Sequence, residues 1–93
     1  EGWIELKFKS RWPPRGGPLK VGLEREQWIW LDEWAAAGGC CWVLAQVGRR
    51  LYLWEGCHAE ELYHGVTEER AMEISFWAGG EGAVWRDLAT ALM

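Results

Sequence analysis

The feature that most constrains the fold is a run of strand length, Cys40–Val47, in which every residue except Gln46 is apolar. A run of this kind is typical of a strand that is covered on both faces, so we expect it at the centre of a sheet. Residues 48–50 then turn the chain into a second apolar run over residues 51–54. The two runs predict a β-hairpin, which Glu55 and Gly56 end.

Residues 3–9 alternate along the chain, and this pattern predicts a half-buried strand. One face of this strand carries the apolar residues Ile4, Leu6 and Phe8, and the other face carries Trp3, Glu5, Lys7 and Lys9. Residues 10–22 hold all three prolines of the chain. Because proline and glycine interrupt both ladders and helices, this segment predicts a loop.

Residues 23–37 predict a helix that Gly38 and Gly39 end. On a helical wheel, Gln27 falls on the inward, apolar stripe of this helix. The stripe is formed by Leu23, Leu31 and Trp34. We therefore expect the amide of Gln27 to point towards the sheet.

Beyond Cys57 the pattern becomes helical. Residues 59–63 predict a short turn or helix, and Thr67 is a suitable N-cap for a helix that runs to Trp77. Residues 84–92 predict a last amphipathic helix. The order of the elements is typical of an α/β fold with a mixed sheet flanked by helices. Because 93 residues, 49% of them apolar, can build one core, residues 1–93 are expected to form one small domain.

Charge is distributed unevenly along the chain, whose formal net charge is -4. The first 25 residues hold more basic than acidic side chains, and the rest of the chain is acidic. A local basic surface is sufficient for contact with nucleic acid, because the contact patch and not the mean charge sets the affinity for phosphates. A solvated loop with ordinary basic residues is the alternative. The basic residues are Lys7, Lys9, Arg11, Arg15, Lys20 and Arg25.

Glu5 and Lys7 are two residues apart on the predicted strand, so their side chains emerge from one face. A carboxylate is a hard ligand for Mg²⁺ or Mn²⁺, and a neighbouring ammonium stabilises the charge that builds on a phosphate under attack. A solvent-facing ion pair is the alternative. Because the inward amide of Gln27 needs hydrogen-bond partners at the sheet, we expect the three groups to converge.

Other kinds of site find little support in the sequence. Cys40 and Cys41 lie on opposite strand faces and the spacing of the cysteines and histidines is irregular, so buried reduced cysteine is favoured over a zinc site. The sequence has no nucleophile elbow and no phosphate-binding glycine loop. It also has no apolar run of bilayer length and no signal-peptide pattern, so we expect no membrane partner. Together with the odd number of cysteines, this favours a cytoplasmic location for the protein. Trp12, in the basic loop, is the tryptophan expected to stack on bases.

Three stretches carry a resemblance to a known family. They are Trp3-Ile4-Glu5-Leu6-Lys7, residues 23–31 (Leu-Glu-Arg-Glu-Gln-Trp-Ile-Trp-Leu) and residues 37–44 (Ala-Gly-Gly-Cys-Cys-Trp-Val-Leu). Together they resemble the PD-(D/E)xK nuclease superfamily, and within it small phage-encoded proteins related to Holliday-junction resolvases and to VRR-NUC nucleases. The resemblance covers residues 2–56, and residues 57–93 form a helical C-terminal part.

The resemblance implies a restriction-endonuclease-like fold with a metal-dependent nuclease site. By position, Glu5 binds the metal, Leu6 offers its backbone carbonyl, Lys7 assists catalysis and Gln27 supports the site. The family's other metal-binding residue is an Asp on the strand before this motif, which the sequence as given does not contain. Glu1 is a poor substitute for it, and Asp32 is a worse one. Glu24 also stands where the family has Ser or Thr as the helix cap.

Two functions follow as expectations. The first is a Mg²⁺- or Mn²⁺-dependent endonuclease that hydrolyses phosphodiester bonds in DNA, with branched DNA among the candidate substrates. The resemblance suggests a homodimer in the cytoplasm, which is the host's cytoplasm if the protein is phage-encoded. DNA phosphates are expected to contact Lys9, Arg11, Arg15, Lys20 and Arg25. The second function is a nuclease-like module without activity that binds DNA or a protein partner, which the missing Asp and the acidic body favour.

Overall fold

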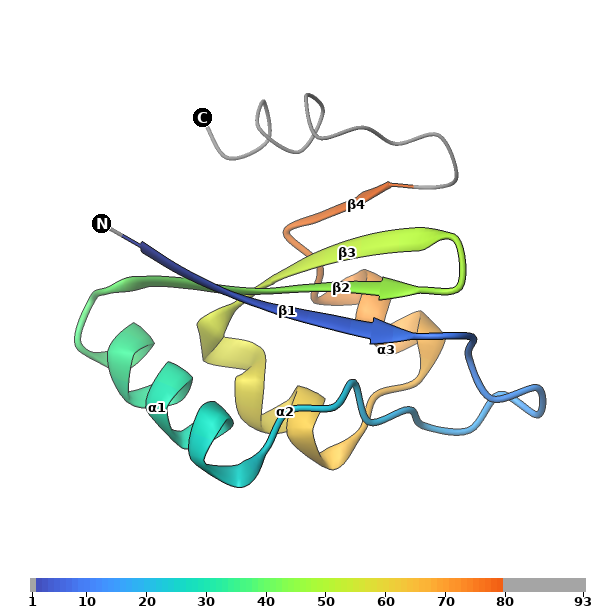
Figure 1. Cartoon of the computed structure of the whole chain (residues 1–93), viewed down its shortest axis with the longest axis horizontal. Coiled ribbons are helices and arrows are strands. Elements are labelled where there is room, and N and C mark those ends of the chain that lie inside the picture. The colour runs from blue at the N-terminus through green and yellow to red at the C-terminus, as the bar shows by residue number, and fades with distance from the viewer. Residues whose placement is uncertain (1, 80–93) are drawn as a thin grey trace.

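Four strands form one mixed sheet in the order β1-β2-β3-β4 (Figure 1). The computed structural model describes residues 2–79, so the helix expected over residues 84–92 lies outside the described part. The strands are β1 (Gly2–Lys9), β2 (Cys40–Val47), β3 (Arg50–Glu55) and β4 (Trp77–Gly79). β1 is parallel to β2, and each later strand is antiparallel to its neighbour. The mixed sheet, the central position of β2 and the β2–β3 hairpin are confirmed.

The helices cover one face of the sheet (Figure 1). They are α1 (Arg25–Ala36), the short 3₁₀ turn η1 (Gly56–His58), α2 (Ala59–His64) and α3 (Glu68–Glu73). α1 links the parallel strands β1 and β2, which need a crossover of this kind. It ends where Gly38 adopts a positive φ of 88°, a conformation that favours glycine. Among residues 2–79, no helix combines the length and the apolar character that a bilayer span requires.

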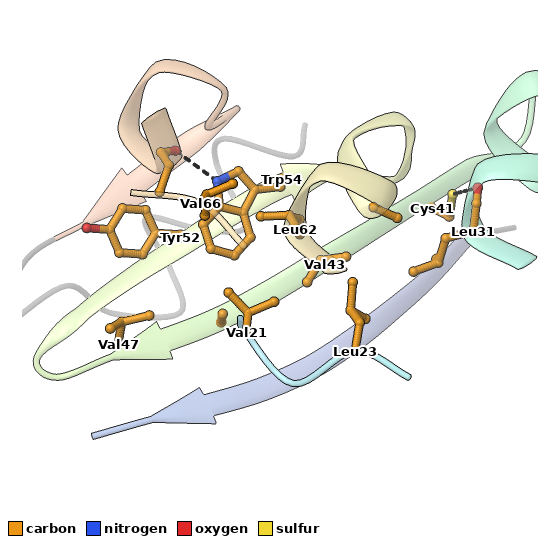
Figure 2. Close-up of a cluster of buried hydrophobic side chains, with 13 residues drawn as sticks. Val21, Leu23, Leu31, Cys41, Val43, Val47, Tyr52, Trp54, Leu62 and Val66 are labelled. Carbon is orange, nitrogen blue, oxygen red and sulfur yellow. Dashed lines mark hydrogen bonds between the residues drawn. The ribbon is translucent and has the colours of Figure 1, made fainter. Parts of the chain in front are cut away.

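The main core lies between the sheet and the helices (Figure 2). Trp54 is fully buried, stacks on Tyr52 with ring centroids 5.2 Å apart, and donates a hydrogen bond of 2.9 Å to the carbonyl oxygen of Ala71 on α3. The indole therefore fills the core without leaving its N–H group unpaired. Leu31 from α1 and Leu62 from α2 complete this layer. The described residues form one small α/β domain.

The end of α3 corrects the sequence prediction. Thr67 caps the helix as expected, since its side chain accepts a hydrogen bond of 3.2 Å from the backbone N–H of Arg70. The helix ends at Glu73, however, and does not continue to Trp77. The backbone N–H of Phe76 donates to the carbonyl oxygen of Leu53, and the chain then pairs with β3 as β4. Pairing with the free edge of β3 therefore determines the conformation of this segment, although its local pattern is helical. The segment also contains residues that favour strands.

The burial of β1 differs from the usual pattern of an amphipathic strand. Its side chains divide between the two faces as predicted, but Ile4, Leu6 and Phe8 are 41%, 66% and 66% exposed. The polar face, which carries Glu5 and Lys7, is the one that lies against the helices. On the face of the sheet opposite the helices, the buried side chains are those of Leu44 on β2 and Leu53 on β3, which form a second small cluster. Contrary to expectation, the apolar side of β1 is thus not part of the main core.

Candidate functional site

The helix-facing side of β1 brings a carboxylate and an ammonium group together. Glu5 and Lys7 are two residues apart on this face, with side chains 18% and 19% exposed. Lys7 Nζ lies 3.7 Å from Glu5 Oε1. Both groups remain accessible from the side because β1 is an edge strand of the sheet among the described residues. They can therefore act on one ligand.

Gln27 connects α1 to this pair. Its Nε2 donates a hydrogen bond to Glu5 Oε1, and its Oε1 accepts one of 2.9 Å from the backbone N–H of Glu24. The second bond belongs to the N-cap of α1, where a side chain at the third helical position reaches back to the cap residue. The start of the helix thus fixes the direction of the amide. The predicted convergence of Glu5, Lys7 and Gln27 is confirmed.

Trp3 adds a second hydrogen-bond donor to the same carboxylate. Its Nε1 donates to Glu5 Oε2 at 3.1 Å. Glu5 therefore receives donors at both oxygens, which fixes its orientation. Two carboxylate oxygens offer about four lone-pair positions, so acceptor capacity remains for a further ligand.

A hollow opens beside these side chains, with a volume of about 540 Å³. This volume lies within the usual range of about 300–1,000 Å³ for small-ligand sites. It is lined by Trp3, Glu5, Glu26, Gln27, Trp30 and Leu31. The hollow combines apolar aromatic walls with two carboxylates and one amide. An arrangement of this kind can hold a partly apolar ligand against a charged centre.

The donor set fits a hard divalent cation only in part. Glu5 and Glu26 provide carboxylate oxygens, which Mg²⁺ and Mn²⁺ prefer. Among residues 2–79, however, no group of three or more His, Cys, Asp or Glu side chains is placed to share an ion. The side chain of Leu6 points to the opposite face of β1, which leaves its backbone carbonyl as the group relevant to the prediction. Water and phosphate oxygens would have to complete the coordination.

The basic residues predicted to contact phosphates lie in three segments, namely β1, the loop that follows it and the start of α1. Lys9 lies beside Lys7, because side-chain carbons of both residues lie within 4.0 Å of the point that a Cβ atom added at Gly22 would occupy. Arg15 and Lys20 are exposed in the loop, and Arg25 is exposed at the start of α1. The structure therefore brings Lys7 and Lys9 together beside Glu5, whereas Arg11, Arg15 and Lys20 lie in the loop and Arg25 lies at the start of α1.

Arg11 and Trp12 belong to a different hollow, of about 360 Å³, at the end of the β2–β3 hairpin. Arg50 and Tyr52 also line it. Trp12 is half-buried, its ring packs edge-on against Tyr52 with centroids 5.8 Å apart, and its Nε1 is buried. Trp12 thus packs at the margin of the core with part of its surface exposed. Its role in base stacking stays a prediction.

The cysteines share a small hollow of about 180 Å³ near η1, but they do not form a metal centre among residues 2–79. Cys41 is buried as expected, whereas Cys40 and Cys57 are exposed. Burial raises the pKa of the Cys41 thiol, and the neighbouring Cys57 and Cys40 raise it further. Burial and the nearby Glu55 also raise the pKa of Cys57. Both groups therefore remain protonated thiols, which are poor nucleophiles and poor ligands.

Sequence reasoning missed three residues of the hollow, namely Trp3, Glu26 and Trp30. Trp3 could have been predicted, since the alternation of the strand places it on the same face as Glu5. Glu26 and Trp30 are four residues apart and so lie on one side of α1, but the sequence does not reveal that this side borders β1. No family model matches the chain, and no curated protein or solved structure shows significant similarity to it.

Proposed function

We propose that this chain is a divalent-metal-dependent DNA nuclease of the PD-(D/E)xK type, with a restriction-endonuclease-like fold. The observation that carries the proposal is the convergence of Lys7 from β1 and Gln27 from α1 on the carboxylate of Glu5. The parallel crossover from β1 through α1 to β2 agrees with the fold that this function requires. A carboxylate, an ammonium and a bracing amide form a site suited to phosphodiester hydrolysis.

Each side chain has a defined role in this proposal. Glu5, together with Glu26 and the backbone carbonyl of Leu6, supplies hard oxygen donors for Mg²⁺ or Mn²⁺. When bound, such a cation supplies Lewis-acid activation of the attacking water and of the phosphate. Lys7 stabilises the negative charge that grows on the phosphate in the transition state. Gln27 holds the Glu5 carboxylate in one orientation, and Lys9 binds an adjacent phosphate.

A second candidate function is a nuclease-like module that binds DNA or a protein without cleaving it. This alternative is favoured by the way in which the polar groups satisfy one another. Glu5 already accepts hydrogen bonds from Trp3 and Gln27 and forms an ion pair with Lys7. A closed network of this kind can serve a structural purpose alone. The two candidates differ in their response to divalent cations.

Nicking of a supercoiled plasmid in the presence of Mn²⁺ tests the first function. We expect Lys7→Ala to slow nicking by about 100-fold or more, because the transition state loses its nearest cation. Lys7→Arg retains the charge and is expected to retain part of the activity. Circular dichroism should show that both variants remain folded, since the Lys7 side chain lies outside the buried core.

Thermal unfolding with and without Mn²⁺ provides the second measurement. The wild-type protein should be stabilised by the ion, because binding to the folded state alone raises its stability. Glu5→Gln should lose this stabilisation. If Lys7→Ala nicks DNA as fast as the wild type, or if Mn²⁺ changes neither stability nor cleavage, the nuclease proposal is wrong and the binding module is favoured. Cleavage of both strands of a branched substrate further requires a homodimer in this proposal.

A further inference from the structure

Three exposed tryptophans lie next to one another, and two of them, Trp3 and Trp30, line the hollow. Trp3, Trp30 and Trp34 are 50%, 39% and 38% exposed, and we call them the tryptophan platform. The ring centroids of Trp3 and Trp30 are 5.3 Å apart, and those of Trp30 and Trp34 are 5.0 Å apart. Large aromatic side chains are normally buried, and a contiguous exposed group of them marks an interaction site.

The platform is held in place by its surroundings. Trp30 and Trp34 are four residues apart on α1 and therefore lie on one side of the helix. The indole of Trp34 occupies the space beside Gly39, where an added Cβ atom would clash with the ring. Trp3 is fixed by its hydrogen bond to Glu5. The rings are thus ordered before any ligand binds, which lowers the entropic cost of binding.

The platform is continuous with the proposed active site. Trp3 and Trp30 line the same hollow as Glu5 and Gln27. Along one face of β1 the order is an indole at Trp3, a carboxylate at Glu5 and ammonium groups at Lys7 and Lys9. Residues on one strand face are about 6.8 Å apart, so the aromatic surface begins within one such step of the carboxylate. A nucleotide presents a flat base followed by a charged phosphate, which the indole of Trp3 and the ammonium groups of Lys7 and Lys9 complement in charge and shape.

We propose that the tryptophan platform stacks an unpaired nucleobase of the DNA substrate while the adjoining phosphate lies at Glu5 and Lys7. This inference rests on the proposed function and gives its substrate class, which is DNA with an unpaired, single-stranded segment. Stacking on indole rings accepts any base, because every base has a π-face. A phosphate backbone suits this surface better than a protein partner, since Lys7 and Lys9 lie on the same face of β1 as Trp3.

Fluorescence anisotropy with a labelled oligothymidylate of about 10 nucleotides, in EDTA, tests the platform without cleavage. We expect Trp30→Ala to weaken single-strand binding about 10-fold, because one stacking surface is lost. Trp30→Phe should retain most of the affinity. Phe76→Ala is the matched control, since Phe76 is an aromatic residue 47% exposed that packs on Trp42, in the second cluster on the other face of the sheet. A blunt duplex should bind equally to all four proteins.

The outcomes separate this inference from the nuclease proposal. If Trp30→Ala and Trp30→Phe bind the oligothymidylate as the wild type does, the platform is not a base-stacking site, whether or not the protein cleaves DNA. If sedimentation velocity shows that Trp30→Ala dissociates a dimer while DNA affinity is unchanged, the platform mediates self-association and the inference is likewise overturned. Binding that depends on Trp30 without any Mn²⁺-dependent nicking would support the platform and reject the nuclease.

Discussion

The side-chain amide of Gln27 on α1 donates a hydrogen bond to the carboxylate of Glu5 on β1, across 22 residues of sequence. The same amide accepts a hydrogen bond from the backbone N–H of Glu24 at the start of α1. One side chain therefore both caps a helix and orients the carboxylate of the candidate site. The stability of this helix end and the geometry of the site are coupled through Gln27.

The double role of Gln27 predicts two effects of one substitution. Gln27→Ala should lower the free energy of unfolding by about 1 kcal/mol, because the backbone N–H of Glu24 loses its acceptor. If the site cleaves DNA, the same variant should be about 10- to 100-fold slower, because Glu5 loses a positioning partner. Urea denaturation measures the first effect, and Mn²⁺-dependent plasmid nicking measures the second.

Gln27→Glu is the matched control for these two effects. It keeps an acceptor for the N–H of Glu24 but replaces the donor to Glu5 with a second carboxylate. The repulsion between these two carboxylates should cost stability although the cap acceptor is kept, and the variant should still lose activity. Full cleavage by both variants would contradict a positioning role for Gln27.

The exposure of the apolar side of β1 predicts that replacing leucine by alanine lowers the free energy of unfolding far less on this strand than in the core. Leu6→Ala should lower the free energy of unfolding by less than about 0.5 kcal/mol, because Leu6 is 66% exposed. Leu31→Ala should cost about 2–5 kcal/mol, because Leu31 is 1% exposed and its truncation leaves a cavity. Urea denaturation of the two variants provides the comparison. Equal losses would mean that Leu6 belongs to a packed core.

Close packing between Gly56 and Cys41 gives a third prediction. A Cβ atom added at Gly56 would clash with Cys41 Sγ and lie 3.2 Å from its carbonyl oxygen. Because both residues are buried, Gly56→Ala should destabilise the protein by about 1–3 kcal/mol in thermal or urea unfolding. Gly17→Ala serves as the control, since a Cβ atom there meets nothing within 4 Å. Adding Cys41→Ala to Gly56→Ala should recover part of the loss, and a failure to do so would exclude the sulfur clash as its cause.

The sequence predicts the centre of this fold better than its first strand. The apolar run of β2, the turn at Gly48 and the run of β3 are local signals, and together they specify the hairpin. In β1, the period of two shows which side chains share a face but not which face meets the helices. That choice depends on Glu5, whose carboxylate is satisfied by Lys7 and Gln27 and can therefore lie under α1.

The limits of sequence reasoning are similar for β4 and for the hollow. Trp77 adopts a strand because β3 offers a free edge, and this edge cannot be seen in the local pattern. The meeting of Trp3 and Trp30 depends on how α1 crosses β1, a property of tertiary packing that helical periodicity does not contain. Gln27 could be predicted because a polar residue on an apolar stripe needs a partner.

The pair formed by Arg70 and Glu61 predicts how stability depends on pH. The guanidinium of Arg70 donates to both carboxylate oxygens of Glu61, at 2.6 and 3.1 Å, and these hydrogen bonds lower the pKa of Glu61. Because the pKa of Glu61 is lower in the folded state, the pair contributes its full share to the free energy of unfolding above the ordinary glutamate pKa of about 4.3. This contribution is lost as the pH falls through the pKa that Glu61 has in the folded state. The effect should be modest, because the two side chains are 47% and 35% exposed. Urea midpoints measured from about pH 5 down to about pH 3 should therefore fall less steeply in Glu61→Gln than in the wild type. Glu69→Gln is the control, because it removes a charge that has no contact with Arg70, and it should keep the wild-type slope. Identical slopes in the wild type and in Glu61→Gln would show that this pair does not link protonation to folding.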